Sequence, residues 1–452
     1  MECSCPCLLK SSRSALHRII RQRMKVLMFG WEFPPHISGG LGTACHGLTR
    51  GMAELGQTEV IFVVPKTFGD EQNESLELIG ANQVAIPETK QLVRTEIEKM
   101  TVIEVDSPLI PYTSETDFWQ LRSNRYINEP RFVQTDDGLR VNFKGGYSGN
   151  LMSEVKKYAL VASVIASGNS FDIIHAHDWL TFQAGIAAKN VSGKPLVIHV
   201  HATEYDRSGG NINPHVYAVE REGMEAADHI IAVSELTKRI IVEKYEIQPE
   251  KVSVVYNAVE PLHENDKEKC VKAINEKVVT FLGRITLQKG PEYFIEAAAL
   301  ILKKVENVRF VMAGSGDLIN RMITHVAELG IAHRFHFTGF LSPDDVHQLF
   351  RMTDVFVMPS VSEPFGIVPL EAMQFNVPVI ISHQSGVSEV IKHAVKIDFW
   401  DTLAMADAIY GLINYDALSH HFKAGGKIEV ENLGWSQSAA NVLQVYQSVL
   451  NQ

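Results

Sequence analysis

Hydrophobic residues in this chain gather into short runs rich in valine and isoleucine, separated by longer segments with apolar residues at helical spacing. In the first half the runs are KVLMFGW, EVIFVVP, DIIHAH, PLVIHV, HIIAVS and VSVVYN, with a helix predicted over 42–55 after the first run. In the second half they are VVTFLGR, VRFVMAG, RFHFTG, DVFVMPS and VPVIIS. Short strands that alternate with helices build parallel sheets covered by helices on both faces. The pattern therefore predicts an α/β protein with two open parallel sheets.

A polar segment, HENDKEKCVKAINEK at residues 263–277, separates the two series of strands. It is poor in strand-forming residues, which predicts a linker between two domains, 24–262 and 263–452. At 452 residues the chain is also longer than one hydrophobic core normally serves. Residues 1–23 are basic and lack the apolar stretch of a secretory signal, so they are predicted to be a disordered extension before the first domain.

The strand and helix pattern breaks between residues 67 and 150. This stretch is less regular, which predicts an insertion in the first domain. It is either a unit with its own small hydrophobic cluster or an acceptor-binding surface. The aromatic residues on which both interpretations depend are Tyr112, Trp119, Tyr126 and Tyr147.

Composition narrows the class of protein. Hydrophobic residues make up 45% of the chain and charged residues 21%, as in globular proteins, and no apolar run reaches membrane-spanning length. The net charge of −11 argues against nucleic acid as a partner, so any phosphate contact must come from a local basic cluster. The cysteines indicate no disulfide framework, which predicts a reducing cytoplasm. They are Cys3, Cys5, Cys7, Cys45 and Cys270.

Candidate chemistry falls at strand ends, where open α/β sheets bind ligands, so the cleft between the two domains is the expected site. The segment PPHISGGLG places Gly39 and Gly40 between the first strand and a helix, where a phosphate can approach the backbone closely. The segment GRITLQKG places Arg284 and Lys289 after the first strand of the second domain. Arginine holds a diphosphate through paired donors and lysine adds a point charge, although basic residues on a loop are often only solvated.

Two histidine segments end strands of the first domain. In HAHDW, strand alternation sends His175 and His177 to one face, and no carboxylate cluster joins them, which argues against a metal site. Asp178 is predicted to be a cleft residue that orients an acceptor hydroxyl. In VIHVHATEYDRSGGN, His201 either donates to a sugar oxygen or is a structural histidine satisfied by loop backbone.

The segment EPFGIVPLE carries two glutamates on either side of Gly366. Glu363 is predicted on a loop after the strand DVFVMPS, and Glu371 about one turn inside the following helix. One carboxylate can accept hydrogen bonds from a sugar and the other from a ribose, while the alternative is a pair of solvated charges. The sequence holds no Asp-x-Asp triplet and no GxxxxGK[ST] loop, so a metal-bridged diphosphate has no obvious ligands. No metal and no other cofactor is expected.

Together SGGLG, HAHDW, HATEYDRSGGN, the arginine and lysine five residues apart, and EPFGIVPLE resemble the retaining two-domain glycosyltransferases, most of all bacterial glycogen and starch synthases. The resemblance runs from about residue 24 to the end. It implies the GT-B fold of two facing Rossmann-like domains, with the nucleotide-sugar held mainly by the second. It also implies transfer of glucose from UDP-glucose or ADP-glucose, with retention, to the non-reducing end of an α-1,4-glucan.

The same resemblance implies roles for residues of the second domain. Arg284 and Lys289 would contact the donor diphosphate, and Glu371 the ribose. Glu363 would hold the transferred glucose, with the Gly366 backbone near its hydroxyls or the phosphate.

In the first domain, Gly39 and Gly40 would close over the diphosphate. His201 would contact the glucose near the reacting carbon, and Asp178 would lie on the acceptor side.

One departure bears on the donor. Starch synthases that use ADP-glucose typically carry Lys-x-Gly-Gly in the first loop, and this chain has Ile37 in place of the lysine.

Three alternatives stay open: a lipid-linked or cell-surface polysaccharide precursor as acceptor, an inactive glucan-binding relative, and a phosphorylase with pyridoxal phosphate. The last would need a Schiff-base lysine in the second domain, and no lysine there stands out.

Overall fold

The structure is a computed structural model that describes residues 23–37, 39–71, 76–86, 132–135, 138–145, 151–262 and 274–452. Several sequence predictions lie outside these ranges. They concern nearly all of the basic extension, most of the linker, the aromatic residues of the insertion, and every cysteine except Cys45. Cys45 is a free, buried thiol.

The first domain is built on a seven-stranded parallel sheet with the order β10-β9-β8-β7-β1-β2-β3. The strand β1 lies next to both β2 and β7, so the first described strand lies in the interior of the sheet. The predicted strands of the first half are all present, and β3 is an addition from the insertion. The bounds are β1 (Met24–Phe29), β2 (Thr58–Val64), β3 (Glu77–Gly80), β7 (Ile173–His177), β8 (Leu196–Val200), β9 (His229–Ala232) and β10 (Val252–Val254).

The second domain is built on a six-stranded parallel sheet with the order β13-β12-β11-β14-β15-β16. Its first strand in the chain, β11, again lies inside the sheet. The prediction of two open parallel sheets is confirmed. The bounds are β11 (Lys277–Leu282), β12 (Val308–Ala313), β13 (Phe335–Gly339), β14 (Val355–Met358), β15 (Val379–Ser382) and β16 (Val395–Ile397).

Besides β3, the described part of the insertion contains a small antiparallel sheet with the order β4-β6-β5. Its strands are β4 (Ala85–Ile86), β5 (Phe132–Thr135) and β6 (Gly138–Val141). They are too short to stand out in the hydrophobic pattern, which explains why the sequence predicted only an irregular stretch.

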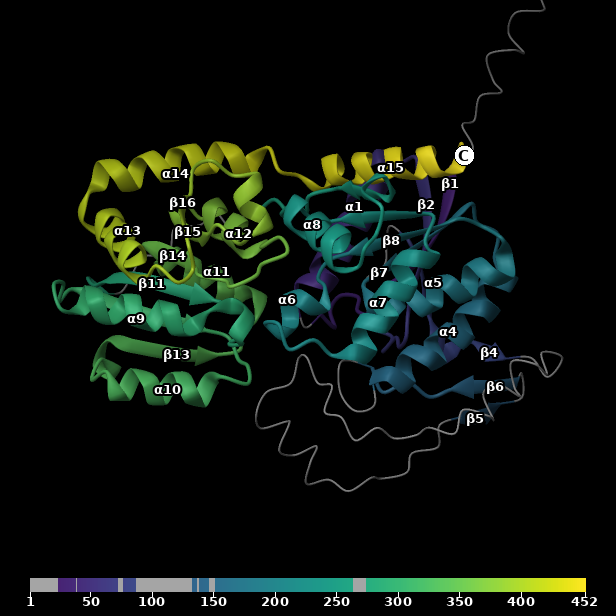
Figure 1. The fold of residues 1–452 in the computed structure, drawn as a ribbon, viewed down its shortest axis with the longest axis horizontal. Coiled ribbons are helices and arrows are strands. Elements are labelled where there is room, and N and C mark those ends of the chain that lie inside the picture. The colour runs from purple at the N-terminus through teal and green to yellow at the C-terminus, as the bar shows by residue number, and fades with distance from the viewer. Residues whose placement is uncertain are drawn as a thin grey trace, which may run out of the picture.

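Helices cover both faces of each sheet (Figure 1). In the first domain they are α1 (Gly40–Leu55), α4 (Leu151–Gly168), α5 (Trp179–Ser192), α6 (Glu204–Ser208), α7 (Pro214–Ala226) and α8 (Glu235–Lys244). In the second they are α9 (Pro291–Leu302), α10 (Ile319–Glu328), α11 (Pro343–Met352), α12 (Val368–Gln374), α13 (Thr402–Asn414) and α14 (Asp416–Glu431). Short 3-10 turns are η1 (Ala81–Gln83), η2 (Pro249–Lys251), η4 (Leu287–Lys289), η5 (Ala332–Arg334) and η6 (Gly386–Glu389).

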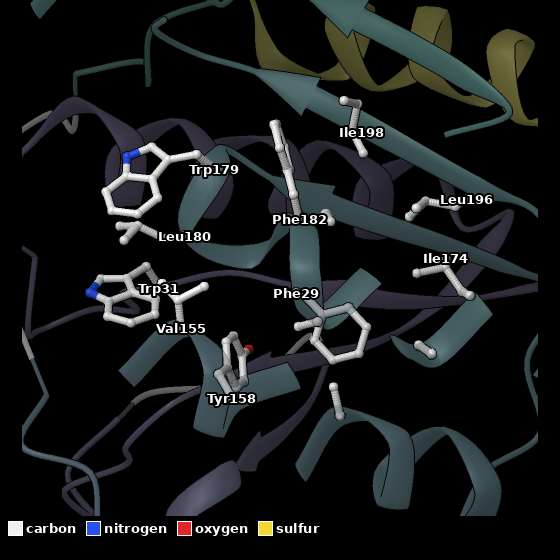
Figure 2. Close-up of a cluster of buried hydrophobic side chains, with 14 of the residues drawn as sticks. Phe29, Trp31, Val155, Tyr158, Ile174, Trp179, Leu180, Phe182, Leu196 and Ile198 are labelled. Carbon is white, nitrogen blue, oxygen red and sulfur yellow. The ribbon is translucent and has the colours of Figure 1, made fainter. Parts of the chain in front are cut away.

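Alternation along the strands divides the first domain into two cores. Phe29 and Ile174 face α4 and α5 and pack with Tyr158 and Phe182, as Figure 2 shows. The Tyr158 hydroxyl lies in this core and donates to the backbone oxygens of Gly30 and Val63. This polar end ties α4 to the carboxyl ends of β1 and β2, next to the loop that carries the glycines.

The last helix, α15 (Trp435–Leu450), returns to the first domain (Figure 1). Its buried residues Trp435 and Tyr446 belong to the core under α1, together with Met28 and Leu48. The division at residue 263 stays a prediction, and the structure adds that the end of the chain packs against the first sheet.

The helices within the described ranges are each too short or too polar to cross a lipid bilayer.

Candidate active site

Lys289 and Glu363 form an ion pair in the second domain. Lys289 ends η4 after β11, and Glu363 lies on the loop after β14. Glu363 is only 6% exposed and also accepts a hydrogen bond of 3.1 Å from the Ser360 hydroxyl. Two oppositely charged side chains of low exposure therefore meet at the strand ends where the sequence predicted a diphosphate and a sugar.

Arg284 lies on the same loop as Lys289, directly after Gly283. Its guanidinium donates to the Gln288 side chain at 3.4 Å, and the Gln288 backbone oxygen accepts from the Val361 amide at 2.8 Å. Gly290 ends the loop at φ 64°, and a Cβ there would lie 2.1 Å from the Pro359 oxygen. The loop of the basic pair is thus packed against the loop of Glu363.

Gly366 and Glu371 follow on the same connection. Gly366 has φ 101°, a conformation that favours glycine, and a Cβ there would lie 3.1 Å from the Glu363 side chain. Glu371 lies one turn inside α12, as predicted. Its side chain is half-buried, and this desolvation raises its pKa to about 7.

The raised pKa of Glu371 predicts a pH-dependent Michaelis constant (KM) for the donor. Above pH 7 the carboxylate is ionised and accepts hydrogen bonds from a ribose, and below pH 7 it is increasingly protonated. Between pH 8 and 6 we expect the donor KM to rise roughly tenfold, the worth of one hydrogen bond to a charged group. Steady-state kinetics should show this rise in the wild type and a flat profile in Glu371→Gln. An equal rise in both proteins would remove Glu371 from the donor site.

Gly39 is the N-cap of α1 and Gly40 its first residue, in the connection that follows β1. An added Cβ at either position would meet no atom within 4 Å, so packing in the described structure does not require glycine at these positions. A Cβ at Gly42, in contrast, would lie 2.7 Å from Ile37. Gly42 is therefore needed for packing, whereas Gly39 and Gly40 leave room beside the backbone.

This difference predicts that Gly40→Ala folds normally but binds the donor less well. The new methyl group would occupy the space through which a phosphate approaches the backbone. We expect an unchanged or slightly raised melting temperature and a higher donor KM. Gly42→Ala is the matched control and should lower the melting temperature. An unchanged donor KM in Gly40→Ala would contradict contact between this loop and the diphosphate.

Asp178 and His201 lie together in the first domain. Asp178 follows β7 with φ 59°, an unusual value for a residue other than glycine, and is 4% exposed. Its Oδ1 accepts from the His201 amide at 2.6 Å and from the Ala202 amide at 3.3 Å. The contacts described for Asp178 thus hold the backbone that carries His201, and its acceptor role stays a prediction. Burial raises the pKa of Asp178 to about 7 and lowers that of His201 to about 3, so the histidine is neutral.

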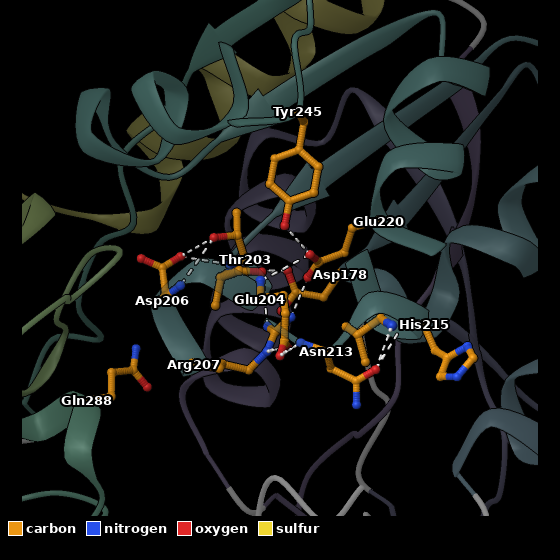
Figure 3. Close-up of polar contacts among 12 residues, drawn as sticks. Asp178, Thr203, Glu204, Asp206, Arg207, Asn213, His215, Glu220, Tyr245 and Gln288 are labelled. Carbon is orange, nitrogen blue, oxygen red and sulfur yellow. Dashed lines mark hydrogen bonds and ion pairs between the residues drawn. The ribbon is translucent and has the colours of Figure 1, made fainter. Parts of the chain in front are cut away.

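The loop after His201 is fixed by a buried polar network (Figure 3). Thr203 and Asp206 form a capping box at the start of α6. Glu220 accepts from the Glu204 amide at 3.0 Å and from the side chains of Arg207 and Tyr245. The network ties the segment between His201 and α7 to Glu220 of α7 and to Tyr245 at the end of α8.

The candidate site residues of the two domains come close to each other at this loop. The Ser362 hydroxyl, next to Glu363, donates to Asp206 Oδ1 at 2.6 Å. Leu287 of η4 packs against Gly209, where a Cβ would lie 2.7 Å from the leucine side chain. The loop of the basic pair, the loop of Glu363 and the loop of His201 are therefore neighbours across the domain boundary.

A second contact between the domains lies at α8. The Glu389 carboxylate accepts from the backbone amides of Glu235 and Leu236 at 2.8 and 2.9 Å. The Ser234 hydroxyl donates to the Pro364 oxygen at 2.6 Å. A glutamate of the second domain thus binds the first turn of a helix in the first domain.

A hollow of about 320 Å³ lies in the first domain beside the glycine loop. It has aromatic, acidic and basic walls. Its lining residues are Trp31, Glu32, Phe33, Pro35, His36, Ile37, Lys66, Phe68, Glu71, Lys144 and Gly145. The sequence predicted none of them as a site residue. Ile37 was noted only because it stands where ADP-glucose-dependent starch synthases typically have lysine.

The sequence interpretation also missed the neighbours of the histidines. His199 of β8 lies beside His177 of β7 in the sheet, and Cys45 of α1 lies above them. The two His-x-His patterns, at the ends of strands that proved to be adjacent, were the available signal.

Comparison with known proteins places this geometry in a family. Residues 263–428 match the family of glycosyl transferases group 1, and residues 135–261 match glycosyltransferase family 4. An uncharacterized glycosyltransferase of Methanocaldococcus jannaschii, MJ1607, is 30% identical over 385 residues, which cover 82% of this chain and 84% of the relative.

Two further relatives have named activities. The alpha-maltose-1-phosphate synthase of Mycolicibacterium smegmatis is 29% identical over 64% of this chain and 81% of its own length. The glycogen synthase of Mycobacterium tuberculosis is 23% identical over 94% of each chain.

Solved structures agree on the fold. Sucrose-phosphate synthase of Thermosynechococcus elongatus has a TM-score of 0.68 at 17% identity, over 95% of this chain and all of the other. Anabaena HepE in complex with UDP and glucose has a TM-score of 0.65 at 16% identity, over 94% and 100% of the two chains. The chain belongs to the group 1 glycosyltransferases and has the GT-B fold, so the resemblance seen in the sequence is confirmed.

Proposed function

We propose that the chain is a retaining hexosyltransferase that moves glucose from UDP-glucose or ADP-glucose to the non-reducing end of an α-1,4-glucan. The observation that carries the proposal is the ion pair of Lys289 and Glu363, on a loop bonded to the His201 loop through Ser362 and Asp206. A bound diphosphate would replace Glu363 as the partner of Lys289 and would also contact Arg284. Glu363 would then be free to accept hydrogen bonds from the sugar hydroxyls.

The proposed reaction needs little covalent chemistry from the protein. The bond between the anomeric carbon and the phosphate oxygen breaks, and a bond from that carbon to the acceptor oxygen forms on the same face. The acceptor proton passes to the departing phosphate oxygen. Asp178 is ill suited to act as a nucleophile, because two backbone amides occupy one of its oxygens and its pKa is raised. Arg284 and Lys289 would stabilise the charge of the departing diphosphate.

A second candidate acceptor is a phosphorylated sugar or polyol. Lys66 and Lys144 line the hollow beside the loop of Gly39 and Gly40. Within the described residues, neither lysine forms an ion pair with a carboxylate. Lys66 Nζ also lies 5.0 Å from the centre of the Phe68 ring, and Phe68 is 52% exposed. An aromatic surface beside two ammonium groups suits a sugar that carries a phosphate. The relative named as a maltose-1-phosphate synthase gives this candidate further support.

A labelled transfer assay distinguishes the candidates. It crosses UDP-, ADP- and GDP-glucose with glycogen, maltooligosaccharides, glucose 1-phosphate and no acceptor, each with and without EDTA. Transfer to glycogen or maltooligosaccharides that survives EDTA supports the first proposal. Transfer to glucose 1-phosphate alone, weakened in Lys66→Ala at an unchanged donor KM, favours the second. Complete loss with EDTA would contradict a metal-free reaction.

A further inference from the structure

Four histidines form a stack on one face of the first sheet, under α1. His175 and His177 of β7 lie beside His199 of β8 and His201, which follows that strand, and side chains two residues apart point to the same face. The ring centroids of His175 and His177 are 4.2 Å apart, those of His199 and His201 4.3 Å, and those of His177 and His201 5.2 Å. Cys45 lies in the core that covers this face.

The stack is short of hydrogen-bond partners. His175 Nδ1 bonds with the Tyr446 hydroxyl, and His177 Nδ1 bonds with His201 Nε2 at 3.0 Å. Five other ring nitrogens, all at most 9% exposed by residue, have no partner among the described residues. A buried polar group without a partner destabilises the fold, so these nitrogens call for a ligand. The unpaired nitrogens include His177 Nε2, His201 Nδ1 and both nitrogens of His199.

Cys45 completes a set of metal-binding atoms. Its sulfur, a ring nitrogen of His177 and one of His201 all lie within 4.8 Å of one another. In a tetrahedral zinc site the Zn–N and Zn–S lengths place ligand atoms roughly 3.3–3.6 Å apart, so small side-chain rotations would bring these three together.

The charge around Cys45 also suits a cation. Burial, and after it the nearby Asp178 and Glu32, raise the pKa of the Cys45 thiol and so oppose a free thiolate. A divalent ion would offset this repulsion, and its binding would release the thiol proton to solvent. Sulfur and imidazole ligands favour zinc and similar transition metals over magnesium or calcium.

We propose that Cys45, His177 and His201 bind one Zn²⁺ or a similar transition-metal ion, and that the bound ion inhibits sugar transfer. The inhibition rests on the proposed contact between His201 and the sugar. His201 Nε2 is already bonded to His177, so a metal ion on Nδ1 would leave the ring no nitrogen for a sugar oxygen. His201 is the most exposed member of the set, at 9%, so the ion would enter beside it. Transfer and metal binding then exclude each other at one side chain.

Cobalt tests the site without reference to activity. The parent protein carries serine at Cys3, Cys5, Cys7 and Cys270, which leaves Cys45 as its one thiol, and is freed of metal with a chelator. One equivalent of Co²⁺ should give a thiolate-to-cobalt charge-transfer band that Zn²⁺ abolishes. The same chain with Cys45→Ala should give no such band. Absence of the band in the parent would overturn the site, whether or not the alanine variant folds.

Activity tests the second half of the proposal. With UDP-glucose or ADP-glucose as donor, one equivalent of Zn²⁺ should lower transfer by the parent roughly 10²-fold, and EDTA should restore it. Cys45→Ala should transfer at the parent rate and resist the same Zn²⁺ concentration. A cobalt band without inhibition would overturn the regulatory claim. Metal-free protein inactive toward every donor would instead contradict the proposed function, and the cobalt band would still decide the site.

Discussion

Replacing Lys289 or Glu363 by alanine is expected to leave a folded protein whose turnover falls by about 10²- to 10³-fold, the usual cost of losing one transition-state contact. Lys289 would no longer offset the charge of the departing diphosphate. Without Glu363 the glucose would lose its main acceptor of hydrogen bonds. Because the two side chains form one ion pair, we expect the double variant to lose much less than the product of the single losses.

Initial rates and melting temperatures should be measured together. Removing one partner leaves the other charge unpaired and little exposed, which by itself destabilises the folded protein. Glu363→Gln keeps the shape of the side chain and should show the same loss of turnover with a smaller loss of stability. Lys277→Ala is the matched control, since this lysine begins β11 and pairs at 3.8 Å with Asp354. Near wild-type turnover in both alanine variants would remove the pair from the active site.

Trp435→Ala is expected to destabilise the first domain, although Trp435 lies near the end of the chain. The indole is 5% exposed and packs on Gly47 of α1, where a Cβ would lie only 2.2 Å from the ring. Replacing a buried tryptophan by alanine costs about 3–5 kcal/mol. For a domain of this size the loss lowers the melting temperature by roughly 10 °C.

Calorimetry measures this loss, with Trp400→Ala as the matched control because its side chain is 56% exposed. We expect the control to melt within about 2 °C of the wild type, as for a surface substitution. The transition that shifts in Trp435→Ala should belong to the first domain. A shift confined to the second domain would contradict the packing of α15 on α1.

Most of the sheet architecture could be predicted because buried parallel strands are continuous apolar runs. The runs DIIHAH and PLVIHV gave β7 and β8 directly. The short strands β3 and β16 escaped, because ELIG and VKI are no more apolar than loop sequence. The return of α15 to the first domain could not be predicted either, since an amphipathic helix does not indicate which sheet it covers.

The sequence could single out candidate residues where they lie close together along the chain, but it could not show which of them packing brings together, and their roles stay predictions. Arg284 and Lys289 could be recognised from the sequence because they share one loop. That this loop lies beside Glu363 could not, because it depends on the pairing of β11 with β14. The role of Asp178 in holding the His201 loop depends likewise on the pairing of β7 with β8. Cys45 gave no signal, because a lone cysteine in a helix reads as an ordinary small core residue.

The proposal under test is sugar transfer with retention at a site that includes Lys289. It is tested most directly by a proton NMR time course of the product, with the best donor and acceptor from the labelled transfer assay. Wild-type protein should first form an α-glycosidic linkage from the α-linked donor, and Lys289→Ala should form it at least about 10²-fold more slowly. A β-linked first product, or an equal rate in Lys289→Ala, would contradict it.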